Sequence, residues 1–89
     1  MNSTIQLIEK TSDLYKKRLV RAIRDSFQHG VYHHRDGESG FRIADVRFSK
    51  GQLQIRTSVF AGPWRVISDD EIDGFSDGYG RHVVASRRP

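Results

Sequence analysis

Between Phe41 and Phe60 the chain alternates apolar and polar residues on both sides of the doublet Lys50-Gly51. Alternation with a period of two is typical of a strand with one buried face, and two such runs around a two-residue turn predict an antiparallel hairpin. The register that follows makes one face apolar, through the pairs Phe48–Leu53, Val46–Ile55 and Ala44–Thr57. The other face is polar, through the pairs Arg47–Gln54 and Asp45–Arg56, and the second of these is a cross-strand ion pair.

A helical pattern precedes the hairpin. Apolar residues recur at spacings of three and four, at Tyr15, Leu19, Ala22, Ile23 and Phe27. Ser12 can cap the start of this helix, Asp13 suits the positive end of its dipole, and Gly30 ends it after about His29. We expect the helix to cover the apolar face of the hairpin and to leave a basic ridge exposed.

The other segments are short. Residues 4–8 fit either a short strand or a first helical turn, and residues 31–39 are polar and rich in turn formers, which predicts a loop. Residues 64–67 predict a third strand with Trp64 as a core anchor, and residues 81–85 predict a last edge strand.

An acidic segment follows the third strand. Ser68 and Glu71 have the spacing of a capping box, and Ile67 and Ile72 have that of a hydrophobic staple. This pattern predicts a short helix that begins at Asp69 and is soon ended by turn sequences.

Together these elements predict an α+β fold: one long amphipathic helix packed on a three- to four-stranded antiparallel meander, with a short acidic helix near the C-terminus. The 89 residues suit a single domain, residues 1–89. The sequence has no cysteine, which favours a reducing, cytoplasmic compartment. It also has no run of about 18 apolar residues and no signal-peptide pattern, so we expect neither a membrane span nor secretion.

Charge is unevenly distributed along the chain. Residues 1–67 carry twelve Lys or Arg and six acids, residues 68–80 carry five acids and no base, and residues 81–89 carry three arginines. The net charge is +4 and the isoelectric point is about 9.9. A surface with both signs favours a protein or nucleoprotein partner at least as much as free nucleic acid.

The acidic segment also imitates half of a calcium-binding loop. Asp69, Glu71, Asp73 and Gly74 match its first positions, but Gly80 stands where the loop needs a bidentate glutamate. The same acids are better used at a helix N-terminus. We therefore expect no metal site and no cofactor.

The histidines of the predicted loop are the candidates for catalysis. His33 and His34 lack a third ligand at a suitable spacing for zinc, and nothing in the sequence fixes their geometry relative to Glu38 for acid–base chemistry. We interpret them as a solvated loop pair and expect a protein that is not an enzyme.

Three surfaces are candidates for partner binding. The basic ridge and the hairpin face carry Lys17, Arg18, Arg21, Arg24, Arg47, Lys50 and Arg56. The predicted loop carries Tyr32, His33, His34 and Arg35. The acidic patch consists of Asp69, Asp70, Glu71 and Asp73. The i, i+4 pairs Asp13–Lys17 and Arg21–Asp25 would thin the basic surface without removing it.

The leading functional hypothesis is a small binding protein that regulates or inhibits a larger nucleic-acid-associated protein assembly. Accessory and inhibitor proteins of phages or mobile elements offer an analogy of size and charge alone. The alternative is direct, largely nonspecific binding of DNA or RNA phosphates, and the third is a small metal-free hydrolase that uses the loop histidines. The sequence leaves open whether the chain forms a homodimer.

Overall fold

The computed structural model describes Glu9 and residues 11–35, 40–57 and 62–85. In chain order they form helix α1 (Asp13–Ser26), the 3-10 turn η1 (Phe27–His29), strands β1 (Val31–His33), β2 (Phe41–Arg42), β3 (Asp45–Ser49), β4 (Gln52–Arg56) and β5 (Arg65–Ile67), the 3-10 helix η2 (Asp69–Gly74) and strand β6 (Phe75–Asp77). The strands make two three-stranded antiparallel sheets, ordered β2-β1-β6 and β3-β4-β5. The described chain is therefore α+β.

The hairpin β3–β4 has the predicted register, with Val46 opposite Ile55 and Phe48 opposite Leu53. Its turn residues Lys50 and Gly51 have φ angles of 53° and 78°. Two left-handed residues in a row are what a type I′ turn requires, and this turn matches the twist of the flanking strands. The two-residue turn thus sets which side chains of the hairpin face inward.

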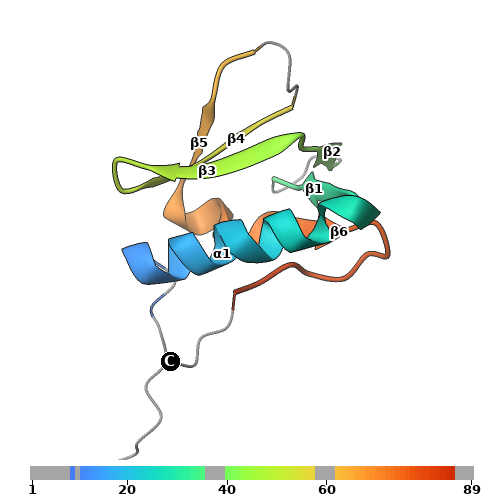
Figure 1. The fold of residues 1–89 in the computed structure, drawn as a ribbon, viewed down its shortest axis with the longest axis horizontal. Coiled ribbons are helices and arrows are strands. Elements are labelled where there is room, and N and C mark those ends of the chain that lie inside the picture. The colour runs from blue at the N-terminus through green and yellow to red at the C-terminus, as the bar shows by residue number, and fades with distance from the viewer. Residues whose placement is uncertain (1–8, 10, 36–39, 58–61, 86–89) are drawn as a thin grey trace, which may run out of the picture.

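Helix α1 covers the inward face of β3 and β4 (Figure 1). Tyr15, Leu19 and Ile23 of the helix are fully buried and belong to the same core cluster as the inward residues of the hairpin, Val46, Leu53 and Ile55. The second sheet adds Val31 and Phe75 to this cluster. The core therefore lies between α1 and the two sheets.

The helix is shorter than the sequence predicts. Ser12 caps it by accepting a hydrogen bond from Tyr15 N (3.1 Å), as expected, but the α-helix has 14 residues and ends at Ser26. There the Ser26 hydroxyl donates to the Ala22 carbonyl (3.0 Å), a local bond that competes with regular helix geometry. The last turn tightens into η1, and Gly30 follows with a φ angle of 80°.

The predicted single meander is divided between two sheets. Ile43 N donates to Val31 O (2.9 Å) and Ala44 N to Arg56 O (2.8 Å), so the chain passes from one sheet to the other between these two residues. The predicted loop 31–39 contributes β1, which pairs with both β2 and β6.

The predicted edge strand over residues 81–85 does not form. Only an isolated bridge joins His82 to Ser76, and Val83 N donates to Phe75 O (3.0 Å). The prediction for residues 4–8 lies outside the described part of the chain.

The predicted short acidic helix is not borne out, because η2 is a six-residue 3-10 helix. Ser68 N does donate to Glu71 Oε1 (3.3 Å), as the capping-box spacing suggests, but the segment then ends at Gly74. The backbone of Gly74 packs so closely on the carbonyl oxygen of His34 that a Cβ would collide with it. The Gly74 carbonyl accepts a hydrogen bond from His34 N (2.8 Å), and the chain continues from Gly74 into strand β6.

Candidate functional site

The outward face of the β3-β4-β5 sheet points away from α1 and carries polar and aromatic side chains. Because successive strand residues alternate between faces, burial of Val46, Leu53 and Ile55 turns their neighbours outward. The outward set is Asp45, Arg47, Ser49, Gln52, Gln54, Arg56, Trp64 and Val66.

At the centre of this face two arginines lie over the ring of Trp64. The guanidinium carbon of Arg47 is 4.2 Å from the ring centroid and that of Arg56 is 4.6 Å away. Both distances are within the range of cation–π attraction. We refer to Arg47, Trp64 and Arg56 as the Arg–Trp stack.

The prediction that Trp64 anchors the core is wrong. Its side chain is only half-buried and does not belong to the core cluster. The reason is strand alternation: Arg65 pairs with Ile55 and Ile67 with Leu53 on the inward face, so residues 64 and 66 turn outward. The sequence contained this signal, since Ile67 and Trp64 are three residues apart and must face opposite sides of a strand.

Hydrogen bonds fix the arginines of the stack. Arg47 Nε donates to Gln54 Oε1 (2.7 Å), and Gln54 Nε2 donates in turn to Gln52 Oε1 (3.3 Å). Arg56 Nη2 lies 3.4 Å from Asp45 Oδ2, which confirms the predicted cross-strand ion pair. These contacts orient both guanidinium groups over the ring of Trp64.

The basic ridge of α1 meets this face along strand β3. Arg24 Nη2 donates to Val46 O (3.1 Å), and Lys17 Nζ lies 5.4 Å from the centroid of the Phe48 ring. A surface groove between α1 and β3 is lined by Lys17, Val20, Arg24, Arg47 and Phe48. The structure therefore brings Lys17, Arg24 and Arg47 together, whereas Arg21 lies exposed on the helix beside this group and Lys50 lies in the exposed hairpin turn.

Fewer cations of this surface are neutralised than the sequence predicts. The expected pairs Asp13–Lys17 and Arg21–Asp25 do not form. Among the described residues, no acid lies within ion-pair distance of Lys17, Arg21, Arg24 or Arg47. Arg18 is half-buried and engaged in an interaction of its own.

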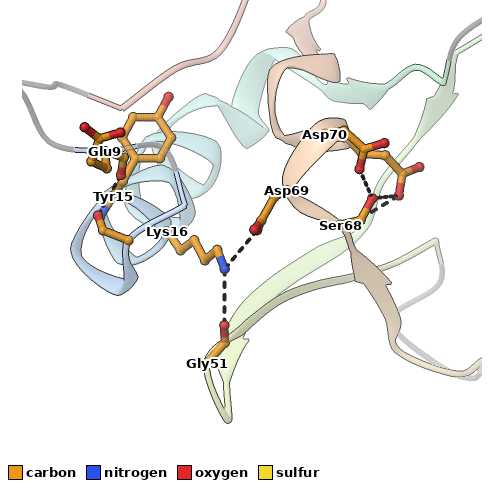
Figure 2. A network of polar contacts seen from close by, with 9 residues as sticks. Glu9, Tyr15, Lys16, Gly51, Ser68, Asp69 and Asp70 are labelled. Atoms are coloured by element: carbon orange, nitrogen blue, oxygen red, sulfur yellow. Dashed lines mark hydrogen bonds and ion pairs between the residues drawn. The ribbon is translucent and has the colours of Figure 1, made fainter.

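The acidic patch, in contrast, makes mostly internal contacts. Asp69 Oδ1 lies 3.1 Å from Lys16 Nζ, which also donates to the Gly51 carbonyl (3.4 Å), as Figure 2 shows. Glu71 Oε2 pairs with Arg35 Nε (2.9 Å) and lies 3.9 Å from Arg65 Nη2. These two acids connect η2 to the helix, to the strand region and to β5.

The other two acids of the patch, Asp70 and Asp73, each interact with a nearby side chain. The Ser68 hydroxyl lies 2.6 Å from Asp70 Oδ1, and this hydrogen bond lowers the pKa of the Asp70 carboxyl. Burial raises the pKa of the Tyr15 phenol, and the charge of Asp73 adds to this rise.

The four residues of the predicted loop surface do not lie on one face, because part of this segment forms strand β1. His33 is fully buried, with its ring centroid 4.6 Å from that of Phe75, and its Nε2 donates to the Glu71 carbonyl (2.9 Å). The interpretation of His33 as a solvated loop residue is therefore wrong, because β1 alternates and turns Val31 and His33 inward. Tyr32 is half-buried on the other side of β1, while His34 and Arg35 are exposed.

His33 and His34 contact different partners, since His34 Nε2 lies 2.9 Å from Ser76 Oγ. Glu38, the other group considered for acid–base chemistry, lies outside the described residues. Within the described part of the chain, no group of three or more His, Asp or Glu side chains could hold a metal ion. The same part contains no helix long and apolar enough to cross a membrane.

Comparisons of the chain with protein-family models, with curated proteins and with solved structures found no match. The basic surface with its Arg–Trp stack is the feature of the molecule that indicates a function.

Proposed function

We propose that this protein is a small non-enzymatic binding protein that regulates or inhibits a larger nucleic-acid-associated protein assembly. The observation that carries the proposal is the Arg–Trp stack on the open face of the β3-β4-β5 sheet. Tryptophan and arginine are the residues most enriched among those that dominate the energy of protein interfaces.

The arrangement of the stack supports a protein partner. Arg47 and Arg56 are already oriented by Gln54 and Asp45, so little side-chain freedom remains to be lost on binding. Polar side chains surround the half-buried ring, as they surround the central contacts of many protein interfaces. The association with nucleic acid is supported by charge, because a surface rich in unpaired cations suits acidic partners and nucleoproteins.

Direct binding of DNA or RNA is the second candidate. It is favoured by one observation: Lys17, Arg21, Arg24 and Arg47 have no acidic partner among the described residues. Cations of this kind can neutralise phosphates without reading sequence. Phosphate binding explains the Arg–Trp stack less well than a protein interface does, since contacts to phosphates do not need an oriented tryptophan.

The test is affinity capture of the assembly from cells that naturally produce the chain, with and without nuclease, followed by titration of the purified partner. We expect capture to survive nuclease, and Trp64→Ala to weaken binding about 30-fold or more, as loss of a dominant interface residue does. Val66→Ala, an exposed change on the same face, is the matched control. Capture that disappears with nuclease, or that is equally strong for Trp64→Ala, would contradict the proposal.

A further inference from the structure

The groove between α1 and β3 combines an apolar floor with a cationic rim. Val20 and Phe48 supply the apolar surface, and Lys17, Arg24 and Arg47 stand around it. No acid is among the described residues that line it. A groove of this composition matches a ligand that carries both negative charge and an apolar group.

Two of the three cations are fixed in place. Arg24 uses one terminal nitrogen on the Val46 carbonyl (3.1 Å), and Arg47 uses Nε on Gln54 (2.7 Å). The remaining donors of both guanidinium groups make no hydrogen bond to the described residues. A carboxylate is a suitable acceptor for them, because charge-assisted bonds to arginine are among the strongest in proteins.

In the middle of β3, next to this groove, the free edge of the strand cannot pair with an added strand. Strand β3 is the outer strand of its sheet. Val46 N donates to Asp45 Oδ1 (2.8 Å) and Val46 O accepts from Arg24, so both outward backbone groups of Val46 are already satisfied. Natural proteins protect edge strands with charged side chains in this way. A bound segment therefore cannot pair with the backbone of Val46, and its side chains can enter the groove instead.

We propose that the groove binds an acidic segment of the partner protein, with one apolar side chain on Val20 and Phe48 and flanking carboxylates on Lys17, Arg24 and Arg47. This inference rests on the proposed function and specifies the chemistry of the partner. A phosphodiester backbone matches the cations but has no group to bury on Val20, whereas a protein segment supplies carboxylates and an aliphatic side chain together. A single strand that stacks a base on Phe48 is the competing occupant, and an oligonucleotide titration tests it.

The single tryptophan provides the measurement. Arg47 lines the groove and also lies over the Trp64 ring, so a ligand that engages Arg47 should change the fluorescence of Trp64. The probe is a capped peptide of glutamates with one central leucine, titrated into the purified chain at low salt. We expect saturable binding that is about tenfold tighter than that of the same peptide with a central serine, because the leucine side chain is buried.

Variants on one helix separate the groove from general charge. Lys17→Glu and Arg24→Glu should each weaken binding of the leucine peptide about tenfold or more, whereas Arg21→Glu, with the same charge change outside the groove, should have a much smaller effect. Arg24→Gln keeps a donor near Val46 and serves if Arg24→Glu proves unstable, with circular dichroism as the check on folding.

Three results would overturn the inference: equal affinity for the leucine and serine peptides, equal losses for Arg21→Glu and Arg24→Glu, or tighter binding of a single-stranded or duplex oligonucleotide than of the leucine peptide. These titrations use the purified chain alone. If the peptide does not bind as expected, capture of the assembly can still depend on Trp64. The two experiments therefore test the groove and the proposed function separately.

Discussion

At the scale of single residues, Lys16 shows how a charge is used inside this small protein. It is almost fully buried, and its ammonium group joins α1 to Asp69 of η2 and to the Gly51 carbonyl of the hairpin turn (Figure 2). The lysine stem packs along the core while the charged end reaches polar partners, as long amphipathic side chains commonly do.

Replacement of Lys16 therefore tests how much the charge contributes. We expect Lys16→Ala to lower the free energy of unfolding by ~1–3 kcal/mol, since it removes both the packing of the stem and the charged hydrogen bonds. Lys16→Met should cost less because it keeps the apolar stem. Chemical denaturation measures both, and the exposed neighbour Lys17→Ala is the control. Equal losses for the methionine and alanine variants would show that packing of the stem does not matter.

Ser68 and Asp70 provide a prediction about pH. The hydrogen bond from the Ser68 hydroxyl lowers the pKa of the Asp70 carboxyl, so its contribution to stability is complete above the unfolded-state pKa and is lost as pH falls through the lowered folded-state pKa. In Ser68→Ala we expect the pKa of Asp70 to rise toward its ordinary value, which carboxyl NMR titration measures.

Asp77 is the internal control for this titration, because the backbone N–H of Arg81 is the main cause that lowers its pKa, and Ser68 is not involved. The stability difference between the wild type and Ser68→Ala should also narrow as the solution becomes more acidic. An Asp70 pKa that stays the same in the variant would contradict the assigned hydrogen bond.

At the scale of elements, α1 and the hairpin form the main part of the core, and two leucines of the same helix test this. Leu19 is fully buried and Leu14 is half exposed. We expect Leu19→Ala to lower the free energy of unfolding by ~2–5 kcal/mol, as removal of buried aliphatic groups does, and Leu14→Ala to change it by less than about 0.5 kcal/mol. Ile55→Ala, on the facing strand, should behave like Leu19→Ala. Similar small losses at Leu19 and Leu14 would show that the helix does not cover the hairpin.

The elements that the sequence predicted well are those determined by neighbours in the chain. The register of β3 and β4 follows from the two-residue turn and from alternation, and the start of α1 follows from Ser12. The pairing of β1 with β6 joins residues far apart in the chain, and the three-residue strand Val31–His33 is too short for alternation to be recognised. The histidine at its core position, His33, hides the strand further, because a polar residue breaks the apolar pattern of a buried face.

The candidate site, too, could be predicted from the sequence only in part. Exposure of Lys17, Arg21 and Arg24 follows from helix periodicity and could be predicted. The stacking of Arg47 on Trp64 depends on how β5 aligns with β4, and the groove depends on how α1 docks against β3. Those alignments are tertiary contacts that local patterns do not determine.

At the scale of the whole molecule, salt dependence separates the two candidate functions. Direct phosphate binding releases counterions, so the logarithm of the binding constant should fall with the logarithm of salt concentration by about 0.7 to 0.9 per contact. Arg21→Ala with Arg24→Ala should then flatten this slope by about two units on any sequence. A protein interface should depend on a few dominant residues and keep most of its affinity in salt.

We expect weak, salt-labile binding of DNA and RNA by the wild-type chain, measured by fluorescence anisotropy over a range of salt concentrations, and salt-tolerant binding of one protein assembly. The reason lies in the geometry of the surface: Arg47 and Arg56 lie over the ring of Trp64, an arrangement that nonspecific phosphate binding does not require. Because Arg56 also pairs with Asp45, a phosphate would have to compete with a carboxylate already in place. Nanomolar binding of bare nucleic acid at physiological salt, abolished by the double arginine variant, would reverse the order of the two functions.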